Sequence, residues 1–160
     1  MSSGKLILFC GKMGAGKTTL SKKIAEERSA ILLSEDEWLA SLYPGEIASL
    51  EQYITCSSRL KPQIKSLVQS ILKSGVDVVM DFPANTQRQR AWFKSIFEPI
   101  NAPHELMVIN VTDKICLQRI AKRSVEQPER AKTDTPEMFE QVTRYFELPA
   151  TDEGFHIVNK

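Results

Sequence analysis

Residues 11–18 constrain this chain more than any other part of its sequence. They read GKMGAGKT and fit the pattern G-x-x-x-x-G-K-[ST], in which glycines let backbone N–H groups converge on phosphate oxygens. The apolar run 5–10 before them predicts a buried strand, and the segment 18–28 after them predicts a helix. The N-terminus of such a helix adds the positive end of its dipole to the site. The sequence therefore predicts a triphosphate-binding loop between the first strand and the first helix.

The residues of this loop have distinct expected roles. We expect Lys17 to bring its ammonium group to the β- and γ-phosphates and the Thr18 hydroxyl to ligate Mg²⁺. Thr19 offers a second hydroxyl to the α-phosphate, whereas Lys12 is expected to face solvent. The predicted nucleotide-binding residues are Gly11, Met13, Gly14, Ala15, Gly16, Lys17, Thr18 and Thr19.

Strand-like and helix-like segments alternate along the rest of the chain. Further strands are predicted at 30–33, 76–80, 105–111 and 155–158, and further helices at 37–43, 58–74, 86–97, 113–124 and 135–146. Pro62 is expected in the first turn of its helix, where proline is tolerated. The polar segment 125–134 predicts a loop or lid. This alternation is typical of an α/β fold, a parallel sheet covered by helices on both faces that binds ligands beyond the carboxyl ends of its strands.

Composition narrows the class of protein further. The length of 160 residues predicts a single domain spanning 1–160, and 21 Lys+Arg against 20 Asp+Glu give a net charge of +1. This balance argues against binding nucleic acid or a membrane through bulk charge. The three cysteines are far apart and predict core positions rather than a disulfide or a zinc site. Because no signal-peptide pattern or long apolar stretch is present, we expect a cytoplasmic location.

Missing motifs separate the classes of nucleotide-binding protein. A GTPase needs an N-K-x-D element to recognise guanine, and the only Asn-Lys pair is at 159–160 with no Asp after it. Motor ATPases usually carry Asp-Glu at a strand end, whereas the third predicted strand ends Met80-Asp81-Phe82. A small kinase that transfers a phosphoryl group to a substrate hydroxyl remains, and such an enzyme needs a carboxylate to orient the acceptor.

Two carboxylates follow predicted strands and are candidates for that chemistry. Asp36 follows the second strand and is the predicted general base, with Glu35 and Glu37 as weaker candidates. The alternative is that Asp36 only caps the helix after it. Asp81 ends the third predicted strand and is expected to support Mg²⁺ or to contact the acceptor. The alternative for Asp81 is a capping residue, although Asn85 or Thr86 already suits that role.

Arginines supply the expected positive charge. Arg119 and Arg123 lie four residues apart on one helix face, and with Arg130 they are expected to reach over the triphosphate and stabilise charge that develops during transfer. The alternative for each of them is a position on a solvated helix face. Arg88 and Arg90 are candidates to contact an anionic acceptor, or else surface charges on an amphipathic helix. The predicted acceptor contacts are thus Asp36, Asp81, Arg88 and Arg130.

These motifs resemble the small P-loop kinases that include the kinase domain of polynucleotide kinase, chloramphenicol phosphotransferase, the zeta-toxin kinases and the bacterial AAA-domain ATP-binding proteins. Asp36 matches the position of the base in polynucleotide kinase, Asp81 the third-strand aspartate, and Arg119 with Arg123 the lid motif. Leu39 stands where polynucleotide kinase has an arginine for the substrate phosphate, which argues against a nucleic-acid acceptor. The resemblance implies a three-layer P-loop fold with a five-stranded parallel sheet in the order 2-3-1-4-5.

The sequence thus favours an ATP- and Mg²⁺-dependent kinase with a small-molecule acceptor. Two alternatives stay open: a nucleotide-dependent switch or slow ATPase that acts through a partner, and a nucleic-acid end kinase. The sequence names neither the acceptor nor the oligomeric state.

Overall fold

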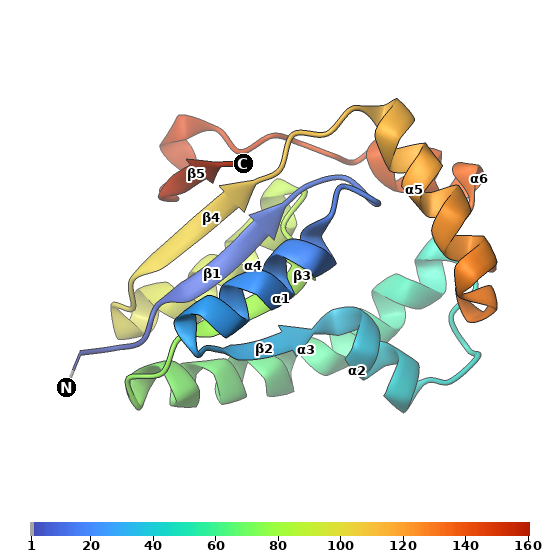
Figure 1. Cartoon of the computed structure of the whole chain (residues 1–160). Coiled ribbons are helices and arrows are strands. Elements are labelled where there is room, and N and C mark those ends of the chain that lie inside the picture. Colours follow the sequence, from blue (N-terminus) through green and yellow to red (C-terminus); the bar gives the residue numbers. More distant parts are fainter. Residues whose placement is uncertain (1) are drawn as a thin grey trace.

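A single parallel sheet organises residues 2–160, the part of the chain that the computed structural model describes. Its strand order is β2-β3-β1-β4-β5, as predicted, and every neighbouring pair is parallel (Figure 1). The strands are β1 (Leu6–Cys10), β2 (Ile31–Ser34), β3 (Val78–Pro83), β4 (His104–Val108) and β5 (Ile157–Asn159). β1 is buried along its whole length, as expected for the middle strand of a parallel sheet covered on both faces.

Helices cover both faces of the sheet. They are α1 (Lys17–Arg28), α2 (Glu35–Leu42), α3 (Leu50–Lys73), α4 (Gln87–Phe97), α5 (Asp113–Glu126) and α6 (Pro136–Thr143). α1 covers one face and α3 and α4 cover the other, while α5 and α6 lie at the end toward which the strands point (Figure 1). Short 3-10 turns at Glu98–Ile100, Pro128–Arg130 and Thr151–Glu153 complete the elements.

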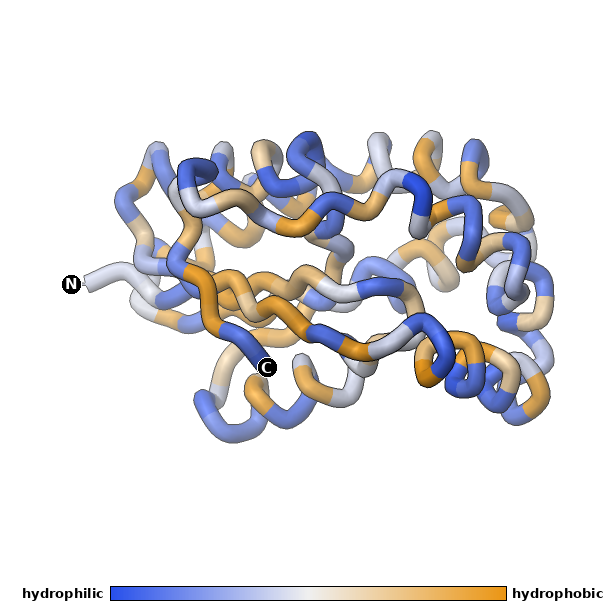
Figure 2. The backbone as a smooth tube through the Cα atoms, turned by 90° about the horizontal axis from the view of Figure 1, so that it is seen from above, coloured by the Kyte–Doolittle hydropathy of each residue, from blue (hydrophilic) through white to orange (hydrophobic). Residues whose placement is uncertain are grey.

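The alternation of side chains along β1 divides the core in two. Leu6, Leu8 and Cys10 belong to the large cluster that includes Leu60 and Ile64 of α3 and Phe93 of α4. Ile7 and Phe9 point to the opposite face and pack with Ile24 and Ala25 of α1. Figure 2 shows the hydrophobic stretches gathered in the strands and the hydrophilic ones on the outer turns of the helices.

Helix α3 is longer than predicted. It begins at Leu50 rather than near residue 58, so Pro62 lies within it and not in its first turn. The reason is visible at its true start, where the Ser49 side chain accepts a hydrogen bond from the Gln52 N–H and the Gln52 side chain accepts one from the Ala48 N–H. This Ser-x-x-Gln pattern resembles a capping box, except that Gln52 bonds to the residue before the N-cap, and it outweighs the proline as a signal.

Other boundaries also differ from the prediction. α2 begins at Glu35, because Ser34 caps it, and β3 continues through Asp81 to Pro83. The predicted lid at 125–134 is only partly a loop, since α5 runs to Glu126 and a 3-10 turn covers Pro128–Arg130. None of the helices in residues 2–160 is long and apolar enough to cross a membrane.

Arg90 lies in the core, contrary to both sequence expectations for it. Its side chain is 0% exposed and pairs with Glu153 at 2.8 Å, and it also donates hydrogen bonds to the carbonyls of Ala84 and Glu147. The guanidinium thereby fastens the segment after α6 to the end of β3. A buried charge persists only where paired and hydrogen-bonded in this way, so we assign Arg90 a structural role.

Candidate active site

Glycines allow the backbone conformation of the loop between β1 and α1. Gly14 and Gly16 have φ angles of 80° and 103°, in the left-handed region that residues with side chains rarely adopt. A Cβ atom at Gly14 would also lie 2.7 Å from the carbonyl oxygen of Cys116 in α5. Gly16 is the N-cap residue of α1 and has no side chain to satisfy the first helical N–H groups. Those groups are therefore suited to bind an anion.

A residue far away in the sequence fixes the start of the loop. The Gly11 N–H donates a hydrogen bond of 2.9 Å to the side-chain oxygen of Asn85, in the loop between β3 and α4. The Asn85 N–H in turn donates to the Gln89 side chain at 2.8 Å. Asn85 therefore ties the phosphate-binding loop to the neighbouring strand. The sequence suggested Asn85 only as a helix cap, and the cap is in fact Thr86.

The side chain of Lys17 folds back to the start of the loop. Its ammonium group donates a hydrogen bond of 2.9 Å to the Gly11 carbonyl. Burial lowers the pKa of Lys17, and the nearby charges of Asp81 and Asp36 oppose this shift. The ammonium thus lies between the loop and two carboxylates, a position from which it can contact bound phosphate.

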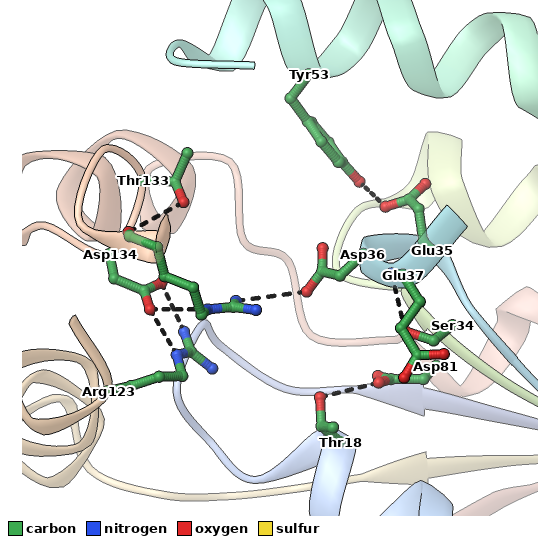
Figure 3. Close-up of polar contacts among 11 residues, drawn as sticks. Thr18, Ser34, Glu35, Asp36, Glu37, Tyr53, Asp81, Arg123, Thr133 and Asp134 are labelled. Atoms are coloured by element: carbon green, nitrogen blue, oxygen red, sulfur yellow. Dashed lines mark hydrogen bonds and ion pairs between the residues drawn. The ribbon is translucent and has the colours of Figure 1, made fainter. Parts of the chain in front are cut away.

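Thr18 and Asp81 form a polar pair beside Lys17. The Thr18 hydroxyl donates a hydrogen bond of 2.9 Å to the Asp81 carboxylate, and Figure 3 shows the two side chains facing each other. Burial raises the pKa of Asp81, although the Thr18 hydrogen bond and the Lys17 charge counteract it. A hydroxyl and a carboxylate are hard oxygen ligands that suit Mg²⁺, which usually keeps water and substrate phosphates as its other ligands.

Asp36 stands across from this pair, in the first turn of α2. Its side chain is 61% exposed, and its charge acts on both Lys17 and Asp81. The N-cap of α2 is the Ser34 hydroxyl, which accepts from the Glu37 N–H at 3.4 Å. The capping alternative for Asp36 is therefore wrong. Figure 3 shows Asp36 between the lid and the Thr18–Asp81 pair.

Glu35 points away from the loop into the interior. Its carboxylate accepts hydrogen bonds from Tyr53 and Ser57 of α3, and burial raises its pKa. Lys61 follows on the same stripe of α3, and burial lowers its pKa while the Glu35 charge opposes the shift. With both carboxylate oxygens engaged, Glu35 is poorly placed to act as the base for which it was a weaker candidate.

A narrow crevice, too tight to hold a water molecule, adjoins Glu35 on the α3–α4 side of the sheet. Its polar lining comes from Glu35, Lys61 and Gln89, and its apolar lining includes Phe82, Trp92 and Phe93. The Lys61 ammonium lies 5.4 Å from the Trp92 ring centroid, a cation–π contact across this crevice. Arg88 is exposed on α4, and its charge contributes to the lowered pKa of Lys61.

The lid arginines occupy three different environments. Arg119 donates hydrogen bonds to the Ala15 and Gly14 carbonyls of the loop, at 3.0 and 3.4 Å. Arg123 forms a bidentate pair with Asp134, at 2.7 and 2.8 Å. Arg130 donates to Asp134 at 2.9 Å and pairs with Asp36 at 3.5 Å. Arg123 is thus held by Asp134, whereas Arg119 contacts the phosphate-binding loop and Arg130 reaches the Asp36 carboxylate.

The predicted site residues therefore fall into two groups. The loop, Thr18, Asp81, Asp36, Arg119 and Arg130 surround one region at the carboxyl ends of β1 and β3, whereas Arg88 lies on the outer side of α4. Sequence reasoning missed Asn85 as an anchor of the loop, Tyr53 as a partner of Glu35, and Asp134. Their contacts join residues distant in the sequence, except that Asp134 follows Arg130 by four residues, a spacing at which a pair could have been sought.

Comparisons with known proteins identify the family of the chain. A family model described as an AAA domain matches residues 6–149. The chain belongs to this family. The predicted kinship with the P-loop kinase-like AAA-domain proteins is therefore confirmed, and so is the fold. A search of curated proteins found no match to the sequence.

Solved structures show the same fold at low sequence identity. Kti12 from Chaetomium thermophilum, in complex with ADP-AlF3, has a TM-score of 0.67 and 16% identity, over 96% of this chain and 88% of its own. The APS kinase CysC of Mycobacterium tuberculosis, in complex with AMPPNP and APS, has a TM-score of 0.64 and 14% identity, over 99% and 90%. An unliganded sugar kinase from Janibacter sp. HTCC2649 has a TM-score of 0.61 and 15% identity, over 99% and 86%.

Proposed function

We propose that this protein is an ATP- and Mg²⁺-dependent phosphotransferase that moves the γ-phosphoryl group to a hydroxyl of a small molecule. One observation carries the proposal. Asp36 presents an exposed carboxylate close to Lys17 and Asp81, across from the phosphate-binding loop. A phosphotransferase needs such a carboxylate beside its phosphate-binding loop, to accept the proton of the acceptor hydroxyl.

The nucleotide would bind through the loop. Backbone N–H groups of residues 11–19 and the start of α1 would hold the phosphates, and Lys17 would contact the β- and γ-phosphates. Thr18 and Asp81 would hold Mg²⁺, which, when bound, neutralises charge on the phosphate oxygens. The nucleotides named with the Kti12 and APS kinase structures support a nucleotide site in this fold.

Asp36 would act on the acceptor. Its carboxylate would accept the proton of the acceptor hydroxyl while the hydroxyl oxygen bonds to the γ-phosphorus and the bond to the ADP oxygen breaks. Arg119 and Arg130 would stabilise the negative charge on the transferring group and its leaving oxygen. The lid would exclude water, so that the acceptor hydroxyl and not water is phosphorylated.

The charge of the chain bears on the kind of acceptor, and the similar structures bear on the reaction. The near-neutral net charge of +1 gives no support to a nucleic-acid acceptor. Two of the similar structures are described as kinases, which supports phosphotransfer.

Phosphorus NMR tests the proposal. ATP and Mg²⁺ are incubated with the protein, alone and with pools of small hydroxyl compounds. We expect a new phosphomonoester signal in at least one pool, absent with Lys17→Ala, and reduced by at least about 10²-fold with Asp36→Asn although nucleotide still binds. Full activity of Asp36→Asn would remove Asp36 from its role. Free phosphate in every pool, with no ester, would instead support a nucleotide-dependent switch or slow ATPase.

A further inference from the structure

Asp134 is the most completely engaged carboxylate of the lid. Its side chain is 0% exposed, although most residues around it in the segment 127–135 are exposed. It accepts two hydrogen bonds from Arg123 and one from Arg130. The backbone N–H of Asp134 also donates to the Arg130 carbonyl at 2.7 Å. One buried carboxylate therefore holds two arginines and closes the turn between them.

The hydrogen bond of Arg130 to Asp134 determines where its Nη2 group points. Its Nε donates to Asp134, and the adjacent Nη2 group lies 3.5 Å from the Asp36 carboxylate. Because a guanidinium is planar and rigid, fixing Nε on Asp134 also restricts the direction of Nη2. Arg130 thus reaches from the lid to the opposite side of the site through the orientation that Asp134 gives it.

Asp36 lies within electrostatic range of Lys17 and Asp81. The Arg130 guanidinium, in contact with Asp36, is therefore close to where the terminal phosphate of a bound nucleotide would lie. The phosphate carries more negative charge than one carboxylate and accepts bidentate hydrogen bonds from arginine. Asp36 and the phosphate should compete for the same guanidinium.

We propose that Asp134 is a positioning residue that aims Arg130 into the site, so that Arg130 exchanges between Asp36 and the terminal phosphate. The inference rests on the proposed function in that it requires a nucleotide at the loop. Binding of the nucleotide would draw Arg130 away from Asp36 and free that carboxylate for the acceptor. The nucleotide would therefore prepare Asp36 before the acceptor reacts.

Calorimetric titration with Mg²⁺ and AMPPNP tests the competition without any acceptor. Asp36→Asn should tighten binding about two- to fivefold, the worth of an exposed ion pair. Part of this gain would come from the lost negative charge alone. Glu37→Gln measures that part, because it removes the same charge one residue away and Glu37 pairs with no arginine in residues 2–160. In an Arg130→Gln background, Asp36→Asn should give no more than the Glu37→Gln effect.

Asp134→Asn tests the positioning role. The extra effect is the amount by which Asp36→Asn tightens AMPPNP binding more than Glu37→Gln does. In an Asp134→Asn background this extra effect should vanish, because Arg130 no longer points at Asp36. Arg123→Gln is the matched control: it breaks the other pair of Asp134 and should leave the extra effect intact. If Asp134 only fastens the lid, Asp134→Asn lowers the melting temperature but the extra effect persists, which would overturn the proposal.

A variant at Arg130 covers the case in which Asp134→Asn does not fold. Arg130→Lys keeps the charge but offers a single ammonium, which cannot bridge Asp134 and Asp36 as the fork does. The extra effect of Asp36→Asn should then fall to that of Glu37→Gln. If wild-type protein does not bind AMPPNP, both this inference and the proposed function are wrong. If it binds and Asp36 and Arg130 act independently, only this inference is wrong.

Discussion

The hydroxyl of Thr18 and the carboxylate of Asp81 are joined by a hydrogen bond of 2.9 Å, although 63 residues separate them. The bond connects the first turn of α1 to β3, across the sheet position where β1 and β3 are neighbours. It brings two oxygen ligands together beside the phosphate-binding loop, where the N-terminus of α1 lies near the end of β3. Asp81 is also largely buried, and this burial raises its pKa, while the Thr18 hydrogen bond and the Lys17 charge act in the opposite direction.

Asp81→Asn should separate metal dependence from stability. The substitution removes a charged ligand, so the strengthening of AMPPNP binding by Mg²⁺ should fall by about 10-fold or more. The free energy of unfolding should not fall below that of the wild type by more than about 1 kcal/mol, because burial disfavours the charged form of Asp81 and the neutral amide avoids this cost.

Titrations with and without Mg²⁺, and urea unfolding, measure the two effects. Thr18→Ser keeps the hydroxyl and should behave as wild type; an unchanged Mg²⁺ effect in Asp81→Asn would exclude Asp81 from the metal site.

Gly14→Ala should damage the loop, whereas Gly45→Ala is its matched control. Both glycines have positive φ angles, 80° and 71°, but an added Cβ meets the Cys116 carbonyl at 2.7 Å only at position 14, and nothing within 4 Å at position 45. We expect Gly45→Ala to lower the free energy of unfolding by about 1–2 kcal/mol through backbone strain alone. Gly14→Ala should lower it more and also weaken AMPPNP binding. Equal losses of stability with unchanged binding would contradict this account of the loop.

Glu35 should make stability depend on pH. Burial raises its pKa above the ordinary value of 4.5, so the folded protein binds more protons than the unfolded chain between that value and the raised one. The contribution of Glu35 is therefore fully present below pH 4.5 and is lost as the pH rises through the folded-state pKa. Urea unfolding between pH 4.5 and 8 should show this decline in the wild type and a flatter profile in Glu35→Gln. Parallel profiles for the two proteins would refute it.

Arg90→Met should be strongly destabilising. Methionine has a long side chain but no hydrogen-bond donor. The substitution therefore leaves Glu153, itself mostly buried, without its partner and removes the donors to the Ala84 and Glu147 carbonyls. Breaking such a pair from one side should lower the free energy of unfolding by about 3–5 kcal/mol. Glu126→Gln, which removes the exposed pair with Lys122, should change it by less than about 0.5 kcal/mol. Denaturant unfolding of both variants gives the comparison, and similar small effects would deny Arg90 its structural role.

The sheet was predictable because its information is local. The run before Gly11 and the alternation of short apolar strands with helices require no knowledge of distant contacts, and they predict a parallel sheet with helices on both faces. The strand order was implied by the family resemblance. Both predictions are confirmed. The start of α3 was mispredicted because Pro62 was given more weight than the Ser49 and Gln52 capping pair. Capping is equally local, so this error was avoidable.

The site was predictable only in part, because half of it depends on tertiary contacts. The loop and the strand-end carboxylates Asp36 and Asp81 follow from motif and position. By contrast, nothing near Asn85 in the sequence points to Gly11, and nothing in the lid pattern distinguishes Arg130, which reaches Asp36, from Arg123, which Asp134 holds. Arg123 and Arg130 differ in role because the folded chain places different carboxylates beside them, and this placement cannot be read from the sequence of the basic segment.

The segment after α6, which Arg90 holds through the Glu147 carbonyl, also affects how the chain folds during its synthesis. The Glu147 N–H donates to the Asn85 carbonyl, and the Asn85 side chain holds the Gly11 N–H, so residues after α6 support the phosphate-binding loop through a single intermediary. A ribosome makes the loop well before it makes the residues that support it. The nucleotide site should therefore mature only after residues 147–153 have left the ribosome, so a nascent chain cannot hold nucleotide in its native geometry earlier.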